Sequence, residues 1–277
     1  MSPIISALEL SKIILNDKLL LLECSYGPTA KAEYLKEHIV GAVFVDLNTQ
    51  LSEIKEYANG GRHPLPKIEN FGKTLGELGL EKNTHVVIYD RKNGASAAAR
   101  FWWMLRSAGH EYVQVLNGGY PQALEIGIAT TDTIPKVKSN MVYEVTDWQL
   151  PRADINEISE KSTNENYVLI DVREHIRYIG EQEPIDEVAG HIPGAINVPF
   201  SQNLDESGLF LSPEILKEKY EAILKEAKET TVHCGSGVTA CHTLLAIAYA
   251  GLPIPKLYVG SWSEWSRNQK PIATGEA

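Results

Sequence analysis

The phrase HIPGAINVP, residues 191–199, repeats a phrase that occurs earlier in the chain, HIVGAVFVD at residues 38–46. In each copy a histidine, an isoleucine, a glycine and an alanine keep their spacing, and a short apolar strand follows. A repeat of this kind changes the interpretation of the whole chain, because each copy then forms a structural unit of its own.

Further phrases match on either side of this repeat and keep the same order. LLLECSY (20–26) corresponds to VLIDVRE (168–174), HVVIYD (85–90) to TTVHC (230–234), and VLNGGY (115–120) to LYVGSW (257–262). Within each half, short β-branched runs alternate with helical patterns, which indicates βα units around a parallel sheet. We therefore predict an α/β protein of two similar domains, each a mostly parallel sheet with helices on both faces.

The stretch at residues 127–145 is typical of a connecting segment, because it lacks helical periodicity and contains Thr, Ser, Asn and Pro. We predict a first domain over residues 1–129, a linker over 130–141 and a second domain over 142–277.

The composition bounds the class of protein. The 277 residues are 43% hydrophobic and 22% charged, as in a soluble globular protein, and the formal charge of −10 without a local basic run argues against nucleic-acid binding. The N-terminus lacks the features of a secretory signal and no apolar run reaches membrane-spanning length. We expect a cytoplasmic protein that does not bind membranes.

Three cysteines, Cys24, Cys234 and Cys241, form neither an even set nor a C-x-x-C pair. This argues against structural disulfides and against a cysteine zinc site, so no metal is expected. One of the three is a candidate for chemistry of its own.

Cys234 ends an apolar run and precedes the loop 235–239, Gly-Ser-Gly-Val-Thr, which opens into an apolar helix. Glycines let backbone N–H groups converge on the sulfur, and the helix start adds positive charge, so the loop would favour a thiolate or persulfide. A buried cysteine in a tight turn is the alternative. The first half has Asp90 at the equivalent place, so packing alone does not hold both loops to one sequence.

A cysteine-dependent phosphatase is disfavoured. Such an enzyme needs an arginine six residues after the nucleophile to grip phosphate, and position 240 is alanine.

The motifs CGSGVTA (234–240), YVGSWSEW (258–265) and GHIPGAINVPF (190–200) resemble the catalytic domain of the tandem-domain rhodanese and 3-mercaptopyruvate sulfurtransferase family. HVVIYD, VLNGGY and RFWWMLRSAGH (100–110) resemble its inactive N-terminal domain, in which an aspartate commonly replaces the catalytic cysteine. The resemblance covers almost the whole chain and implies two rhodanese-like domains.

The resemblance implies that Cys234 takes sulfur from a small donor, becomes a persulfide and needs no separate cofactor. The neutral pair Gly235-Ser236 is similar to loops of 3-mercaptopyruvate sulfurtransferases, which release pyruvate, whereas thiosulfate-preferring rhodaneses usually have basic residues there. Sulfur then passes to cyanide or a thiol, for which a thioredoxin-like protein is one candidate.

The resemblance also implies a proton relay in which Ser236 acts with an aspartate and a histidine, here Asp46 and His63. The alternatives are a solvated loop histidine for His63 and a turn-capping carboxylate for Asp46.

Arg177 matches the family arginine that binds the substrate carboxylate and carbonyl, and its alternative is an ion pair with a nearby glutamate. Ile185 stands where a second arginine is expected, and Arg62 or Arg173 is a candidate replacement, with Arg173 better explained by a structural ion pair.

The rest of the loop is expected to bind substrate as well. Its members are Gly235, Gly237, Val238 and Thr239, which supply backbone donors and, from Thr239, a hydroxyl for loop or helix-end amides. Two functions remain as alternatives to mercaptopyruvate sulfurtransfer: a thiosulfate sulfurtransferase and a non-catalytic rhodanese-like binding module.

Overall fold

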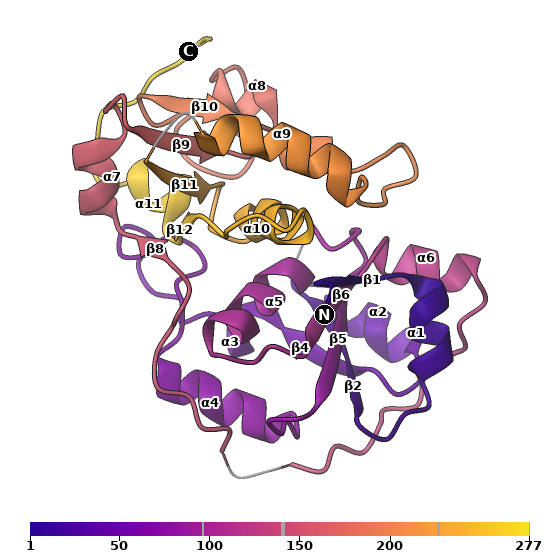
Figure 1. Ribbon diagram of the computed structural model, residues 1–277. Coiled ribbons are helices and arrows are strands. Elements are labelled where there is room, and N and C mark those ends of the chain that lie inside the picture. Colours follow the sequence, from indigo (N-terminus) through magenta and orange to yellow (C-terminus); the bar gives the residue numbers. More distant parts are fainter. Residues whose placement is uncertain (96, 140–141, 226–227, 277) are drawn as a thin grey trace. The chain divides into compact units, whose positions relative to one another are not determined.

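Two five-stranded sheets, one in each half of the chain, form the framework of the computed structural model, which describes residues 1–95, 97–139, 142–225 and 228–276 (Figure 1). All strand pairs in both sheets are parallel, as βα repeats require. The first compact unit comprises Met1–Glu53, Pro66–Gln149 and Glu206–Leu209, and the second comprises Ile54–Leu65, Leu150–Asp205 and Phe210–Ala277.

The first unit has the sheet order β1-β6-β5-β2-β4. Its strands are β1 (Ile4–Ile5), β2 (Leu19–Ser25), β4 (Val43–Asp46), β5 (His85–Tyr89) and β6 (Val113–Leu116), with β3 (His38–Ile39) and β7 (Thr130–Thr131) as a separate antiparallel pair. Its helices are α1 (Ala7–Ile13), α2 (Ala30–Lys36), α3 (Leu47–Gln50), α4 (Ile68–Glu77), α5 (Ala98–Ser107) and α6 (Gly119–Glu125).

The second unit has the sheet order β8-β12-β11-β9-β10, read in the matching direction. Its strands are β8 (Arg152–Ala153), β9 (Tyr167–Asp171), β10 (Ala195–Asn197), β11 (Glu229–His233) and β12 (Lys256–Tyr258). Its helices are α7 (Ile155–Lys161), α8 (His175–Tyr178), the 3-10 helix η1 (Phe200–Asn203), α9 (Pro213–Lys225), α10 (Ala240–Tyr249) and α11 (Ser261–Trp265).

The two sheets confirm the duplication, because each matched phrase occupies the same place in its sheet. HVVIYD and TTVHC form or end the central strands β5 and β11, while VLNGGY and LYVGSW each begin with the last two residues of the neighbouring strands β6 and β12. The predicted α/β fold with two parallel sheets is therefore confirmed.

A tyrosine–histidine pair repeats in the two units and extends the sequence match. In the first unit Tyr34 stacks on His38 with ring centroids 3.9 Å apart, and in the second Tyr178 stacks on His191 at 3.8 Å. Each tyrosine hydroxyl donates a hydrogen bond, of 2.8 and 2.6 Å respectively, to the carbonyl oxygen of the alanine four residues after the histidine. The HIxGA phrase is thus a packing unit that anchors the preceding helix.

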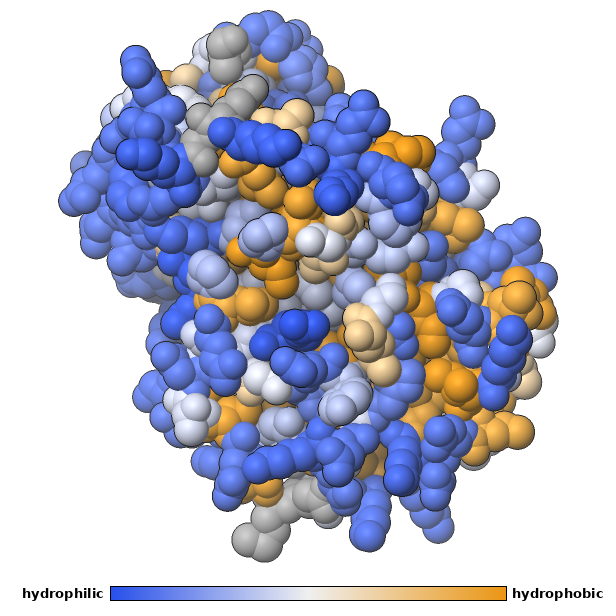
Figure 2. Space-filling view, in the orientation of Figure 1, coloured by the Kyte–Doolittle hydropathy of each residue, from blue (hydrophilic) through white to orange (hydrophobic). Residues whose placement is uncertain are grey.

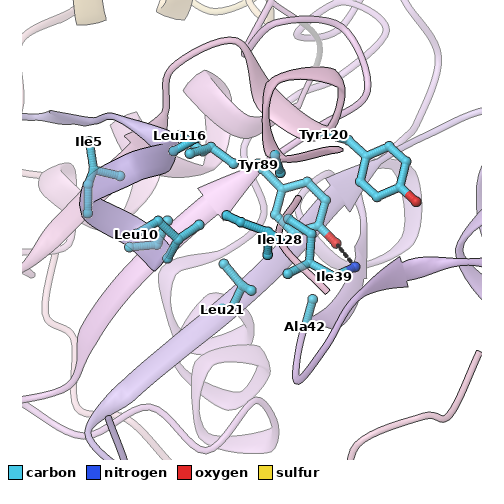
Figure 3. Packing of buried hydrophobic residues seen from close by; sticks show 12 residues of the cluster. Ile5, Leu10, Leu21, Ile39, Ala42, Tyr89, Leu116, Tyr120 and Ile128 are labelled. Carbon is cyan, nitrogen blue, oxygen red and sulfur yellow. Dashed lines mark hydrogen bonds between the residues drawn. The ribbon is translucent and has the colours of Figure 1, made fainter. Parts of the chain in front are cut away.

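Helices cover both faces of the first sheet. On one face Val87 and Tyr89 pack with Leu10 of α1 and Tyr120 of α6 in a buried cluster (Figure 3). Side chains of successive strand residues point to opposite faces, so the equally buried Ile88 lies on the other face, to which α5 packs. Such two-sided burial explains why the strands read as continuous apolar runs.

The face of the molecule drawn in Figure 2 carries mostly hydrophilic side chains, with smaller hydrophobic areas between them. This is the pattern expected for helices that bury one apolar stripe, as α4 does with Phe71 and Leu75.

The compact units differ from the predicted domain boundaries in three places, one of which is Glu206–Leu209, predicted in the second domain but packed in the first unit. Residues 130–139 and 142–149, predicted as linker and as the start of the second domain, pack in the first unit, because β7 pairs with β3 and Tyr143 N donates to the carbonyl oxygen of Gly72. Residues 54–65, predicted in the first domain, pack in the second unit. Residues 140–141 of the predicted linker lie outside the described residues.

Candidate active site

Cys234 lies at the carboxyl end of the central strand β11, where loops of parallel sheets form binding sites. The thiol is buried, with 2% of the residue exposed. The start of α11 braces the loop through the backbone: Trp262 N donates to the Cys234 carbonyl oxygen at 3.0 Å, and Ser263 N to that of Gly235 at 2.9 Å. Ser261 Oγ accepts from Cys234 N at 3.2 Å. The cysteine is therefore held rigidly by the downstream GSWSEW phrase.

Gly237 is required by the geometry of the loop. Its φ of +72° lies in the left-handed region, and a Cβ atom would lie 2.4 Å from the carbonyl oxygen of Val259. The loop therefore packs directly against the chain that follows β12.

Thr239 does not play its predicted role as a helix cap. It precedes α10 with helical backbone angles, φ −67° and ψ −24°, and its side chain makes no capping hydrogen bond. A capping side chain normally needs an extended backbone to reach back to the helix amides. Val238 is buried, and Cys241 Sγ donates to the carbonyl oxygen of Gly237 at 3.3 Å. Cys241 is thus a core residue of the helix.

Ser236 and His63 come together as predicted, although they are far apart in sequence. His63 Nδ1 lies 2.8 Å from Ser236 Oγ, and both residues are buried. The solvated-loop alternative for His63 is therefore wrong. Ser236 lies two residues from Cys234 along the chain, and His63 belongs to the same compact unit.

Asp46 lies in the first unit, at the end of β4. Its carboxylate caps α3 by accepting from Thr49 N at 2.9 Å. This is the turn-capping role given above as the alternative, and a part for Asp46 in the proton relay stays a prediction.

Arg177 lies beside the cysteine loop and also forms an ion pair. A Cβ atom on Gly235 would lie 3.5 Å from Arg177 Nη2. The same nitrogen donates to Glu183 Oε1 at 2.7 Å, and Arg177 Nε donates to Glu183 Oε2 at 3.1 Å. The functional and ion-pair interpretations are therefore compatible, because Glu183 holds the guanidinium at the loop.

Of the two candidate replacements for the missing second arginine, only Arg62 approaches the loop. Arg173 is buried against Asp171, and its guanidinium lies 4.7 Å from the ring centroid of Trp262. Arg62 Nη2 would lie 2.9 Å from a Cβ atom on Gly235. The aligned position, Ile185, is 57% exposed.

In the equivalent loop of the first unit, a side-chain carboxylate accepts the backbone hydrogen bonds. Asp90 follows β5 as Cys234 follows β11, and its Oδ1 accepts from Lys92 N at 2.8 Å and Gly94 N at 2.9 Å. Its Oδ2 accepts from Ala98 N, at the start of α5, at 3.2 Å. A buried carboxylate thus fills the cradle of backbone donors, which indicates what kind of group this turn stabilises.

Two histidines flank the cysteine motif, and both are buried in the core rather than presented to a ligand. Burial lowers the pKa of His233, which packs beside Asp171. Burial also lowers the pKa of His242 to about 3, with the Lys219 ammonium adding to the effect, and the His242 ring stacks on Phe210 at 4.4 Å. At neutral pH His242 is therefore an uncharged core side chain.

The depressed pKa of His242 predicts an acid sensitivity. Between about pH 6.5 and pH 3 the unfolded chain binds a proton at this histidine and the folded chain does not, so stability falls as the pH falls. The free energy of unfolding of the native protein should drop, relative to His242→Leu, by about 1.4 kcal/mol per pH unit below pH 6. Urea unfolding at pH 7, 6 and 5 measures this, and parallel pH profiles for the two proteins would contradict it.

Among the residues that the structure describes, no group of three or more His, Cys, Asp and Glu side chains could hold a metal ion. In the same residues, no helix is both long and apolar enough to cross a membrane. All three cysteines are free and buried.

Comparison with protein families identifies two copies of one domain. The family model of the rhodanese-like domain matches residues 6–125 and 154–268. The two matches enclose the two loops described above, with Asp90 in the first and Cys234 in the second.

The similar proteins of known name include two kinds of sulfurtransferase. A probable 3-mercaptopyruvate sulfurtransferase of Pseudomonas aeruginosa is 38% identical, over 99% of this chain and 98% of the relative. The human 3-mercaptopyruvate sulfurtransferase is 36% identical over 88% of this chain and 82% of its own length. A thiosulfate sulfurtransferase of Rattus norvegicus is also 36% identical, over 87% and 82%.

Solved structures agree with this. The 3-mercaptopyruvate sulfurtransferase from Leishmania major superimposes with a TM-score of 0.82 at 26% identity, covering 98% of this chain and 76% of that one. SseA from Escherichia coli, described as a 3-mercaptopyruvate sulfotransferase, gives a TM-score of 0.78 at 29% identity, covering 95% and 99%.

Proposed function

The chain belongs to the rhodanese family, and from that premise we propose that it is a sulfurtransferase that carries sulfur from 3-mercaptopyruvate to a thiol or cyanide through a Cys234 persulfide. The observation that carries the proposal is the buried Ser236–His63 pair, with 2.8 Å between Oγ and Nδ1, next to Cys234 in its loop. The P. aeruginosa relative of nearly equal length supports the same donor.

In the first half-reaction the Cys234 thiolate attacks the sulfur of 3-mercaptopyruvate. The S–S bond forms as the C–S bond breaks, and the electron pair of that bond moves to the substrate carbon as an enolate. The substrate's thiol proton ends on this carbon and gives pyruvate, leaving the anionic persulfide on Cys234. We assign the movement of that proton to Ser236 and His63, because a hydroxyl and an imidazole can each donate and accept a proton and the two lie 2.8 Å apart.

In the second half-reaction an acceptor thiol takes the outer sulfur. The acceptor sulfur bonds to it, the S–S bond to Cys234 breaks, and the thiol proton leaves with the new persulfide. A thioredoxin-like protein is a candidate acceptor. The three free cysteines favour a reducing compartment, for which the cytoplasm is our proposal.

Arg177 is proposed to bind the donor. Its guanidinium lies beside Gly235, where a planar α-keto acid can receive parallel N–H bonds from it. The remaining loop residues, Gly235, Gly237 and Val238, shape the cradle that stabilises the persulfide anion.

Thiosulfate is the second candidate donor, because the thiosulfate sulfurtransferase of Rattus norvegicus is 36% identical to this chain. The guanidinium groups of Arg62 and Arg177 next to the loop would also suit a dianion. The experiment is to measure kcat/KM for both donors while identifying the product, pyruvate or sulfite. Our proposal expects pyruvate release with the higher kcat/KM. Efficient sulfite release with negligible pyruvate would favour thiosulfate, and no sulfur transfer from either would indicate a binding module.

The proton relay gives a prediction that separates the two donors. Thiosulfate transfers its outer sulfur without moving a proton, whereas 3-mercaptopyruvate must move one from sulfur to carbon. Ser236→Ala should therefore lower kcat with 3-mercaptopyruvate by about 100-fold, the usual contribution of a positioned acid–base group, and affect thiosulfate much less. Equal losses with both donors would show that Ser236 only shapes the loop.

A further inference from the structure

The segment 54–65 is fastened to the catalytic unit by side chains of α11. Glu264 Oε1 accepts a hydrogen bond from Gly60 N at 2.8 Å, and Ser263 Oγ accepts one from Arg62 N at 3.0 Å. Both bonds use the backbone of the segment, so they fix its path without occupying the Arg62 side chain. The segment thus has a defined position over the cysteine loop.

A close backbone approach confirms that position. Gly61 has a φ of +79°, and a Cβ atom there would lie 2.3 Å from the carbonyl oxygen of Gly260. Only glycine allows the segment to come so near the turn that braces Cys234.

The Arg62 guanidinium is aimed at the loop and is incompletely used by the protein. Nη1 binds Asp186 Oδ1, the guanidinium's one partner among the described residues. Nη2 is the closest atom, at 2.9 Å, to a Cβ position on Gly235, followed by the two terminal nitrogens of Arg177 at 3.5 and 3.7 Å. A guanidinium has five N–H donors, so several remain for a ligand.

The Asp186 carboxylate orients the Arg62 guanidinium, but it is not an ion-pair partner of Arg62 alone. Its Oδ1 also accepts from Arg267 Nη1 at 3.0 Å, and its Oδ2 lies 3.6 Å from Arg177 Nη2. One carboxylate is thus shared among three guanidinium groups, two of which face Gly235. The terminal nitrogens of Arg62 and Arg177 that face Gly235 can therefore still donate N–H bonds to an anionic ligand.

We propose that Arg62 is a donor-binding residue that forms, with Arg177, a two-arginine clamp for the anionic group of the sulfur donor. It takes the place of the arginine that is absent at Ile185, but reaches the site from a segment in the first half of the sequence. The inference rests on the proposed function, since it names the group that holds the donor while Cys234 attacks it.

The test compares Arg62→Gln and Arg62→Lys with the native protein in the donor half-reaction, followed by pyruvate release in a single turnover. Losing a charge-assisted hydrogen bond should raise the donor concentration for half-maximal rate by about 10-fold to 100-fold in Arg62→Gln. In Arg62→Lys, which keeps the positive charge but not the paired N–H donors, this concentration should lie between the values for the native protein and Arg62→Gln. Inhibition by added pyruvate should weaken in parallel, and transfer from the preformed persulfide to dithiothreitol, an uncharged thiol, should be unchanged.

Arg267→Gln is the matched control, because it removes an ion pair to the same Asp186 oxygen from a guanidinium that is not among the nearest groups to Gly235. It should leave the donor constant and the pyruvate inhibition within about twofold of native values, because the Arg62 and Arg177 nitrogens next to Gly235 stay in place. Unchanged donor and pyruvate constants in Arg62→Gln, or equal losses in Arg267→Gln, would overturn the proposal. A native protein that takes sulfur from neither donor would overturn the proposed function and this inference with it.

Discussion

Replacing the nucleophile should abolish sulfur transfer: Cys234→Ser is expected to release pyruvate at least about 10⁴-fold more slowly than the native protein, the scale on which removal of a nucleophile acts. A serine hydroxyl at this place is far less nucleophilic than a thiolate and forms no persulfide. The loop itself should persist, because its braces from Ser261 and Trp262 bind the backbone of residue 234.

Cys241→Ser is the control for this substitution. Cys241 is a buried thiol in the same motif, and a serine hydroxyl can donate the same hydrogen bond to the carbonyl oxygen of Gly237. It should retain sulfur transfer. Comparable activity in Cys234→Ser and the native protein would remove Cys234 from the mechanism.

Arg173→Met should cause the largest loss of stability. Arg173 Nη2 donates to Asp171 Oδ2 at 2.6 Å, with 1% of one side chain and none of the other exposed. Although burial raises the pKa of Asp171, the adjacent Arg173 charge brings that pKa below its usual value. Removing the arginine leaves a buried carboxylate without its main partner, which should cost about 3–5 kcal/mol in the free energy of unfolding by urea.

The double variant Asp171→Asn with Arg173→Met tests the cause. Without the buried charge it should be more stable than Arg173→Met alone, because the penalty comes from the unpaired carboxylate. If the double variant is the less stable of the two, the loss comes from packing, such as the contact of the guanidinium with Trp262.

The two sheets could be predicted from the sequence, because the residue patterns that specify their strands are local and occur twice. Each matched phrase contains its own strand and turn, so the common order of phrases predicts a common order of strands. The position of Cys234 follows from the same rule, since a residue that ends a central parallel strand lies at the binding edge of the sheet.

Contacts between distant segments were harder to predict. The local sequence GGRHPLP (60–66) does not predict that Arg62 packs by Gly235, because that position depends on hydrogen bonds to Ser263 and Glu264 of α11, about 200 residues later in the chain. Side-chain orientation was also out of reach, as for the Thr239 hydroxyl, which makes no cap. The contact of His63 with Ser236 follows from the family resemblance and not from the local sequence.

The central claim, that Cys234 carries the sulfur, is tested most directly by intact mass spectrometry after mixing the native protein with 3-mercaptopyruvate in the absence of an acceptor. The account predicts a gain of one sulfur atom, mapped to the peptide that contains Cys234, together with one pyruvate per protein molecule. The gain should disappear when dithiothreitol is added. A protein whose mass stays unchanged while pyruvate accumulates, or a sulfur atom mapped to Cys24 or Cys241, would contradict the account.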